Sequence, residues 1–323
     1  MAITKKNKLL YLITLFTTQS DEQHPISMSE ILTYLNKLNI QAERKSIYDD
    51  INLLQSWGMD ILFTRSKKQG YYLASTSFDA VEIKIIVDMI ASAEFISSKK
   101  SKELIQKCTS LLSNHQAKEI QQNLRLSTNK KENEHLFYSI HVLQEALNKK
   151  ERISFQYFDY SFKNEKQYRK NATRYSLIPL TLIFENQRYY CIGYSEKYNN
   201  LTHYRVDKMD HVLLDGKADP IKKSTKAYIE STFKLTLGEV ENVSIRFNNR
   251  VLHQVQDDLG QSLFIEKKTD DFFIINLSTS LSPTFISWIL QFNFDATVLK
   301  PQKLINQLLD ISTNIQKIYS TSL

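Results

Sequence analysis

The spacing of apolar residues changes near residue 137 of this 323-residue chain, and that change constrains the possible folds more than any other feature. Up to about residue 126 the apolar side chains recur every three or four positions, which is the period of an amphipathic helix. From residue 137 to about 220, after one more predicted helix, they alternate in short runs such as ISFQY and RYYCIGY, which is the period of a half-buried strand. A chain of this length is expected to form more than one core.

Three predicted helices and a hairpin occupy the first 75 residues. Ser27-Met-Ser-Glu30 has the spacing of a capping box and predicts the start of the second helix. The third helix follows Glu43 and ends at Gly58, and three residues at i, i+4 and i+7 form its buried face: Ile47, Ile51 and Leu54. Two short strands follow, joined by the basic tip TRSKKQ. This order is typical of a winged helix-turn-helix domain, whose third helix lies in the DNA major groove.

The outer face of the third predicted helix carries side chains that suit DNA. Basic groups neutralise phosphates, while tyrosine and asparagine can bind sugars and base edges. The predicted DNA-binding residues are Arg44, Lys45, Ser46, Tyr48 and Asn52 in the helix, and Arg65, Lys67 and Lys68 in the hairpin tip. An ordinary amphipathic helix with a solvated polar face is the alternative interpretation.

The strand-rich part and the end of the chain predict two further domains. Short, twisted, aromatic-rich strands predict a small Sm-like or SH3-like β-barrel. The last segment alternates strand, helix, strand, strand, helix, strand and helix, which resembles a ferredoxin-like α+β unit. We therefore expect an α+β multidomain protein with a winged helix-turn-helix at residues 1–75, a helical linker at 76–134, the barrel at 135–222 and an α+β domain at 238–323.

Composition narrows the class of partner and of chemistry. The net charge of +7 favours an anionic partner, which could be nucleic acid, a membrane surface or an acidic ligand. The only two cysteines, Cys108 and Cys191, lie far apart and outside any CxxC motif, so we expect neither a disulfide framework nor a zinc site, and a cytoplasmic location. No apolar run is long enough to span a membrane. No catalytic or metal-binding spacing stands out, so we expect neither enzymatic activity nor a cofactor.

Two segments of the N-terminal part resemble a known family of DNA-binding proteins. KSIYDDINLLQSWGMDI, followed by KKQGYYL, is similar to the DNA-reading end of DeoR-like winged-helix proteins. Asp50, Ile51, Leu54 and Gly58 match the usual pattern of that family, whereas Asp49 stands where arginine is common. The resemblance implies DNA binding, and the departure at Asp49 bears on the operator sequence.

The barrel segment resembles the WYL domain of the same regulators. Tyr189-Tyr190-Cys191 occupies the position of the Trp-Tyr-Leu triplet, with Tyr175 to Pro179 before it and Tyr204 to Met209 after it. Trp288 to Phe292 and Lys300-Pro301 are similar to the extension that commonly follows a WYL domain. The resemblance implies a sensor of nucleic-acid-derived effectors, with pocket residues at the positions of Tyr175, Arg205 and Lys208.

The residues themselves favour the same kind of ligand. Aromatic faces can stack on bases beside basic groups that bind phosphate. The predicted effector-binding residues are Tyr157, Tyr175, Tyr190, His203, Arg205 and Lys208. Strand alternation places His203 and Arg205 on one face and Tyr204 and Lys208 on the other, so one shallow pocket needs a bulge or bend to use both. Half-buried barrel core is the alternative for each tyrosine.

These features together predict a bacterial-type transcription regulator. We expect a homodimer that reads a palindromic double-stranded DNA operator, because one recognition helix reads only a few base pairs. The helical segment 78–126 is the candidate for dimer contacts, and the WYL domain is expected to sense a nucleotide-like or single-stranded nucleic-acid effector. The alternative is a nucleic-acid-binding accessory factor, in phage defence or the DNA-damage response, without a small-molecule effector.

Overall fold

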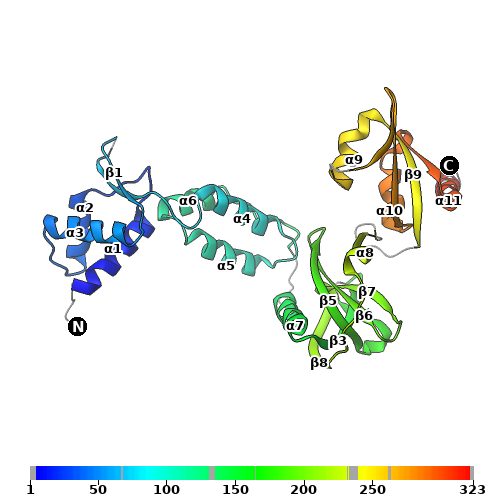
Figure 1. The fold of residues 1–323 in the computed structure, drawn as a ribbon, viewed down its shortest axis with the longest axis horizontal. Helices are drawn as coiled ribbons and strands as arrows, with labels where there is room; N and C mark the ends of the chain where they lie inside the picture. Colours follow the sequence, from blue (N-terminus) through cyan, green and yellow to red (C-terminus); the bar gives the residue numbers. More distant parts are fainter. Residues whose placement is uncertain are drawn as a thin grey trace. The chain divides into compact units, whose positions relative to one another are not determined.

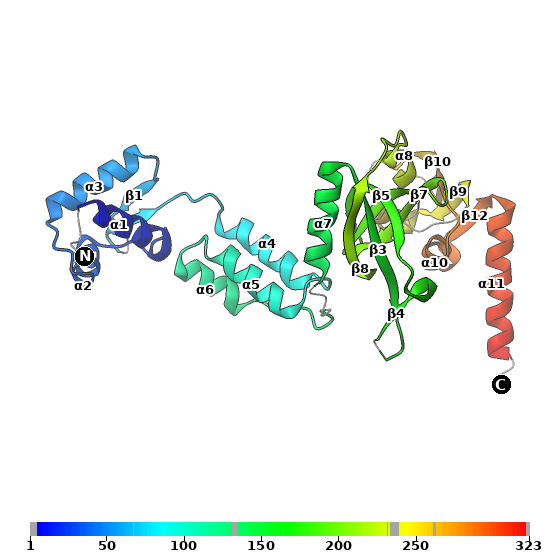
Figure 2. The same ribbon diagram turned by 90° about the horizontal axis from the view of Figure 1, so that it is seen from below.

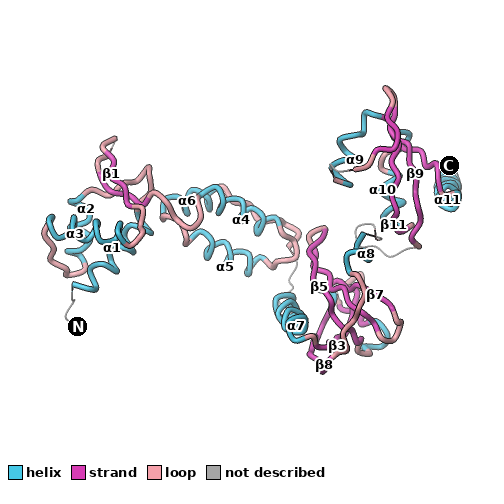
Figure 3. The backbone as a smooth tube through the Cα atoms, in the orientation of Figure 1, coloured by secondary structure: helices cyan, strands magenta, loops and turns pink. Residues whose placement is uncertain are grey.

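The computed structural model describes residues 5–66, 68–130, 135–163, 165–230, 232, 239–260 and 263–320. The chain divides into two compact units, Met1–Glu134 and His135–Leu323. Helices and antiparallel strands are both present, so the fold is mixed α and β. Helices dominate the first unit, whereas strands concentrate in the second (Figure 3).

The first unit consists of helices and one hairpin in its described residues (Figure 1). Its elements are α1 (Lys5–Gln19), α2 (Met28–Lys37), α3 (Arg44–Ser56), β1 (Ile61–Thr64), β2 (Gly70–Leu73), α4 (Ala80–Ser92), α5 (Ser98–Thr109) and α6 (Asn114–Gln122). The helical periodicity of residues 78–126 thus belongs to three helices. Ser97 and Ser113 mark the two breaks, because their hydroxyls accept hydrogen bonds from the first-turn amides of α5 and α6.

Local interactions fix the ends of α2 and the orientation of α3. The predicted capping box is confirmed: the Ser27 hydroxyl accepts from the Glu30 amide, and the Glu30 carboxylate accepts from the Ser27 amide at 2.8 Å. The predicted buried face of α3 is also confirmed, since Ile47, Ile51 and Leu54 are all buried. These side chains pack in one core with α1 and α2.

The β1–β2 hairpin is joined to the segment before α2. The backbones of Ile26 and Tyr71 exchange two hydrogen bonds, each 2.8 Å long. Gly70 permits this approach, because a Cβ atom there would lie 2.6 Å from the carbonyl oxygen of Ile26. The hairpin is therefore fixed against the three helices.

A curled, six-stranded antiparallel sheet follows α7 (His135–Lys149) in the second unit. Its strands are β3 (Glu151–Tyr160), β4 (Lys166–Tyr168), β5 (Tyr175–Glu185), β6 (Arg188–Ser195), β7 (Asn200–Arg205) and β8 (Met209–Lys217). The strand order is β4-β3-β5-β6-β7, and β8 pairs with β3. The β3–β4 hairpin extends beyond the neighbouring strands (Figure 2).

β5 is a single long strand, and its pairing with β6 shifts between Pro179 and Thr181. A tight turn joins β5 to β6: Asn186 and Gln187 have φ values of 49° and 58°, as in a type I′ hairpin turn.

The remaining elements form a four-stranded sheet with helices. They are α8 (Thr225–Glu230), β9 (Val240–Asn248), α9 (Leu252–Leu259), β10 (Ile265–Lys268), β11 (Phe272–Ser280), α10 (Pro283–Leu290), β12 (Ala296–Lys300) and α11 (Gln302–Ser320). The antiparallel order β10-β11-β9-β12 packs an aromatic-rich core that includes Phe247, Phe273 and Trp288. Ser282 caps α10, and Pro283 is at its start.

No helix in the described part of the chain combines the length and apolar character needed to cross a membrane.

Candidate functional site

One face of α3 is open to solvent. The predicted contact residues that lie there, all exposed, are Arg44, Lys45, Tyr48 and Asn52. The Tyr48 side chain is 46% exposed, and its ring centroid lies 6.5 Å from that of Tyr71 in the hairpin. The outer face of α3 and the hairpin are therefore neighbours, which would allow one ligand to contact both.

Ser46 lies nearer to α1 than the other predicted residues of α3. The ammonium group of Lys8 donates to the Ser46 hydroxyl at 2.5 Å and forms an ion pair with Asp50, also at 2.5 Å. Lys8 is only 8% exposed. Ser46 thus helps to hold α3 against α1 in this structure.

The basic residues of the hairpin tip have different surroundings. Arg65 is exposed, and Lys67 lies outside the described residues. Lys68 forms an ion pair with Glu30 at 2.8 Å. The hydrogen bond from Lys68 lowers the pKa of Glu30 to about 2. An anionic ligand at the tip would therefore have to replace this carboxylate in order to bind Lys68.

A buried carboxylate joins α1 to α6, and sequence analysis did not find it. Asp21 is 6% exposed and accepts hydrogen bonds from the hydroxyl of Ser113 and from the ring of His24, the latter at 2.8 Å. Burial raises the pKa of Asp21, but the hydrogen bonds from Ser113 and His24 outweigh it, so the pKa is lowered. The His24 ring stacks on His115 with centroids 3.8 Å apart.

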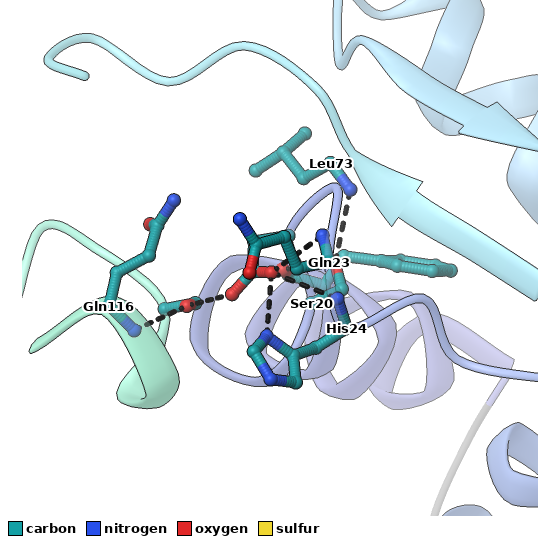
Figure 4. A network of polar contacts seen from close by, with 8 residues as sticks. Ser20, Gln23, His24, Leu73 and Gln116 are labelled. Atoms are coloured by element: carbon teal, nitrogen blue, oxygen red, sulfur yellow. Dashed lines mark hydrogen bonds and ion pairs between the residues drawn. The ribbon is translucent and has the colours of Figure 1, made fainter. Parts of the chain in front are cut away.

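Two further hydrogen bonds extend this junction (Figure 4). The Gln116 backbone amide donates to the Ser113 hydroxyl at 3.2 Å. The same hydroxyl donates to Asp21, so Ser113 both caps α6 and binds Asp21. The Leu73 amide of β2 donates to the Ser20 hydroxyl at 3.0 Å. The turn after α1 is therefore tied to both the hairpin and α6. Asp21 could not be found from sequence, because its partner Ser113 is distant along the chain.

Four aromatic rings from three strands form a cluster in the curled sheet. Its members are Phe155 and Tyr157 of β3, Tyr175 of β5 and Tyr204 of β7. Phe155 and Tyr157 are buried, whereas Tyr175 and Tyr204 are half-buried. The Tyr175 ring stacks on Phe155 at 5.5 Å, and Tyr204 meets the other rings edge-on. The sequence predicted Tyr157 and Tyr175 as site residues, and Tyr204 joins them.

Two cations lie over this cluster. The Arg169 guanidinium carbon is 5.2 Å from the ring centroid of Tyr157, and the Lys170 ammonium nitrogen is 4.3 Å from that of Tyr175. Arg169 also donates to Asp159 at 2.6 Å, and Lys208 pairs with the same carboxylate. These two hydrogen bonds, from Arg169 first, lower the pKa of Asp159 to about 2.

The other predicted effector residues lie on the opposite face of the sheet, as alternation predicts. Tyr190 is paired with Arg205, and Ile192 with His203, so these residues share a face that excludes Tyr204. Tyr190 is buried, and the His203 ring lies 2.9 Å from the Tyr228 hydroxyl of α8. Arg205 forms a two-pronged ion pair with Asp207, at 3.0 and 2.6 Å.

The six predicted effector residues therefore form two groups. Tyr157, Tyr175 and, through Asp159, Lys208 belong to the cluster side, while Tyr190, His203 and Arg205 belong to the α8 side. One hydrogen bond joins the groups, because the Arg205 amide donates to the Tyr157 hydroxyl at 3.3 Å.

Cys191, beside Tyr190 on β6, is fully buried. Burial raises the pKa of its thiol to about 12, so the reactive thiolate is scarce at neutral pH. This environment suits a core residue rather than a nucleophile.

Two cavities lie away from the aromatic cluster. One, of about 440 Å³, is lined by residues of the first unit that include His24, Lys68 and His115. The other, of about 310 Å³, is mostly apolar and lies beside α7 and β5, with Leu147, Pro179 and Ile221 in its wall.

Comparisons with known proteins place part of this chain in a family. A search of curated proteins returned no match. Among solved structures, the chain is similar to proteasome accessory factor B/C (PafBC) of Arthrobacter aurescens, with 15% identity and a TM-score of 0.30, over 94% of this chain and 47% of that one. It spans less than half of that protein. A CRISPR Cas-related protein has 11% identity and a TM-score of 0.39, over 99% of this chain and 82% of that one.

Residues 139–214 match the family model described as the WYL domain, so the second unit contains a WYL domain.

Proposed function

We propose that this protein is a sequence-specific, DNA-binding transcription regulator with a ligand-responsive WYL domain. The observation that carries the proposal is the exposed face of α3, where Lys45, Tyr48 and Asn52 lie beside a basic hairpin while the opposite face is packed in the core. A helix about 12 Å across fits the major groove, and a hairpin tip can contact the backbone next to it. On this proposal α1 to β2 form a winged helix-turn-helix domain.

The finer architecture belongs to the same proposal. The curled sheet serves as a small Sm-like or SH3-like barrel, and the last sheet, in the order β10-β11-β9-β12, serves as a ferredoxin-like extension of the WYL domain. A palindromic operator needs two copies of α3, so the active species is a homodimer, with α4 to α6 as the candidate dimer segment. The protein binds its ligands and catalyses no reaction.

The effector side of the proposal uses the aromatic cluster. Its tyrosines offer ring faces for a base, and Arg169, Lys170 and Lys208 lie close enough to bind an attached phosphate. A nucleotide-like molecule or a short single strand fits this chemistry. The α8 side, where Tyr190 is buried and His203 contacts Tyr228, gives less access to a base.

The DNA-binding proposal is tested with two variants and a charge control. A preferred duplex is first selected from random sequences, and affinity is then measured over a range of salt concentrations. We expect Lys45→Ala to weaken binding by about 1–3 kcal/mol, and Arg65→Ala to reduce the salt slope by about one unit. Lys268→Ala removes the same charge from an exposed position in β10, outside the candidate dimer segment, and should change neither quantity by as much. If Lys45→Ala, Arg65→Ala and Lys268→Ala behaved alike, the α3 and hairpin assignment would be wrong.

A nucleic-acid-binding accessory factor without a small effector is the second candidate. The observation that favours it is the same tyrosine cluster with its cations, because stacking and phosphate contacts also hold single strands without sequence preference. The two functions are separated by the nucleic acid that binds best. A regulator prefers one duplex sequence with a dyad, whereas an accessory factor prefers single strands and loses them when Tyr175 is replaced by alanine.

A further inference from the structure

The segment Arg169–Ala172, here called the strap, covers the outer side of the aromatic cluster. It follows β4 and brings the Arg169 guanidinium to 5.2 Å from the Tyr157 ring and the Lys170 ammonium to 4.3 Å from the Tyr175 ring. Lys170 also donates to the Tyr198 hydroxyl at 2.9 Å. The ring faces that would stack on a base are thus already in contact with cations of the same chain.

The strap has a backbone that its residue types do not favour. Lys170, Asn171 and Ala172 have φ values of 51°, 51° and 63°, although none of them is glycine. Two described hydrogen bonds reach its backbone carbonyls: the Gln156 side-chain amide donates to Ala172 at 2.8 Å, and the Thr173 amide donates to Lys170 at 3.0 Å. A strained segment with exposed basic side chains can change conformation when those side chains find better partners.

The two faces of the sheet differ in what covers them. On the α8 side, the Tyr190 and His203 rings lie about 6 Å apart, and His203 contacts Tyr228 of α8. On the cluster side, the cover consists of two long, exposed basic side chains. Uncovering Tyr175 therefore requires only that Lys170 change rotamer, whereas uncovering Tyr190 requires a helix to move.

The chemistry of the cover selects the ligand. A phosphate offers Lys170 and Arg169 charge-assisted hydrogen bonds, which are stronger than contact with a neutral ring. A base offers Tyr175 a stacking partner once Lys170 leaves its ring. A base without a phosphate has to compete with the cations for the ring faces. A phosphate without a base leaves the rings without a stacking partner. The Nε atom of Arg169 donates to Asp159, and this contact keeps Arg169 in place. Lys170 is therefore the residue that moves.

We infer that the strap is a gate in which Lys170 substitutes for the ligand on the Tyr175 face while Arg169 stays beside it, so that the cluster is selective for a nucleotide unit, meaning a base that carries a phosphate. This inference rests on the proposed effector role of the cluster and adds that Lys170 must leave Tyr175 before a base can stack there. The unit can be a free nucleotide or part of a single strand, since both present the same chemistry.

The test is calorimetric titration of the full chain with three probes: adenosine, adenosine 5′-monophosphate and a six-residue oligoadenylate. The variant Lys170→Gln removes the cation that covers Tyr175. Lys163→Gln is the matched control, because Lys163 is exposed between β3 and β4 and the structure describes no ring contact for it. For Lys170→Gln we expect affinity for the phosphate-bearing probes to fall at least about tenfold. Affinity for adenosine should stay equal or rise about fivefold, because the Tyr175 face is uncovered. Lys163→Gln should behave as the wild type.

The two phosphate-bearing probes distinguish a free nucleotide from a single strand, because the preferred form of the ligand binds with the higher affinity. Loss of adenosine and nucleotide affinity by the same factor in Lys170→Gln would show that Lys170 only supports the fold of the site, and would overturn the gate. Unchanged nucleotide affinity would overturn it as well. If the wild-type protein bound none of the probes while still binding its duplex, the effector part of the proposed function would fail and the gate with it.

Discussion

At the scale of single residues, Asp210 is the carboxylate that holds β4 to the rest of the curled sheet. It is 4% exposed and accepts hydrogen bonds from Lys166 at 2.6 Å and from the Tyr168 hydroxyl at 2.7 Å. Burial raises the pKa of Asp210, but these two hydrogen bonds outweigh it and hold the pKa below its ordinary value. The same contact raises the pKa of Tyr168 to about 12. The ionised carboxylate therefore stabilises the strand from which the strap begins.

We expect Asp210→Asn to lower the free energy of unfolding by about 2 kcal/mol at pH 7, because Lys166 and Tyr168 lose a charged acceptor. Since the folded-state pKa is depressed, this stability is present above the unfolded pKa of about 3.9 and is lost as the pH falls below it. Urea unfolding at several pH values between 7 and 3 measures the difference between variant and wild type, which should shrink in the acidic samples. Asp215→Asn, on an exposed position of the same strand, is the control. A difference that stayed constant with pH would contradict this assignment.

At the scale of helices and strands, the features predicted well are those that depend on neighbours in sequence. The α2 capping box and the buried face of α3 follow from residues three or four positions apart, so the sequence contains all the information. The pairing of β3 with β8 and the register shift in β5 depend on contacts between distant segments, and the alternation pattern alone does not specify them. The face shared by His203 and Arg205 was predicted, because alternation within one strand determines it. The ion pair between Lys208 and Asp159 was not predicted, because the two residues are distant in sequence.

Gly193 is a second feature of the sheet that alternation does not reveal. A Cβ atom at this position would lie 2.5 Å from the carbonyl oxygen of Ile178 and 2.6 Å from a side-chain carbon of Leu177. We expect Gly193→Ala to destabilise the protein by about 3 kcal/mol, because β5 and β6 must separate to admit the methyl group. Gly216→Ala is the comparison, since its Cβ would meet open space and only its φ of 79° opposes substitution, at about 1 kcal/mol. Thermal unfolding of both variants shows which substitution is more destabilising. Equal losses of stability would contradict the close approach of β5 to Gly193.

At the scale of the whole molecule, the proposed regulation requires that ligand binding in one unit change DNA affinity in the other. Such coupling is reciprocal, so DNA must change ligand affinity by the same factor. α6 is the last described helix before the boundary between the units, and the junction at Asp21 ties it to the turn after α1. The same turn is bonded to β2 through Ser20. This arrangement makes the junction a candidate element for transmitting the ligand state to α3 and the hairpin.

We therefore expect Ser113→Ala to uncouple the two binding events without abolishing either. The variant loses the α6 cap and the bond to Asp21, so the free energy of unfolding should fall by about 2 kcal/mol while both units remain folded. Duplex affinity is measured with and without a saturating effector, and the ratio of the two affinities should be about fivefold smaller than in the wild type. Ser97→Ala is the matched control, because Ser97 caps α5 in the same way and the structure describes no contact from it to α1. If both variants kept the wild-type response to the effector, the coupling would have to run through other contacts, and Asp21 would be a purely structural residue.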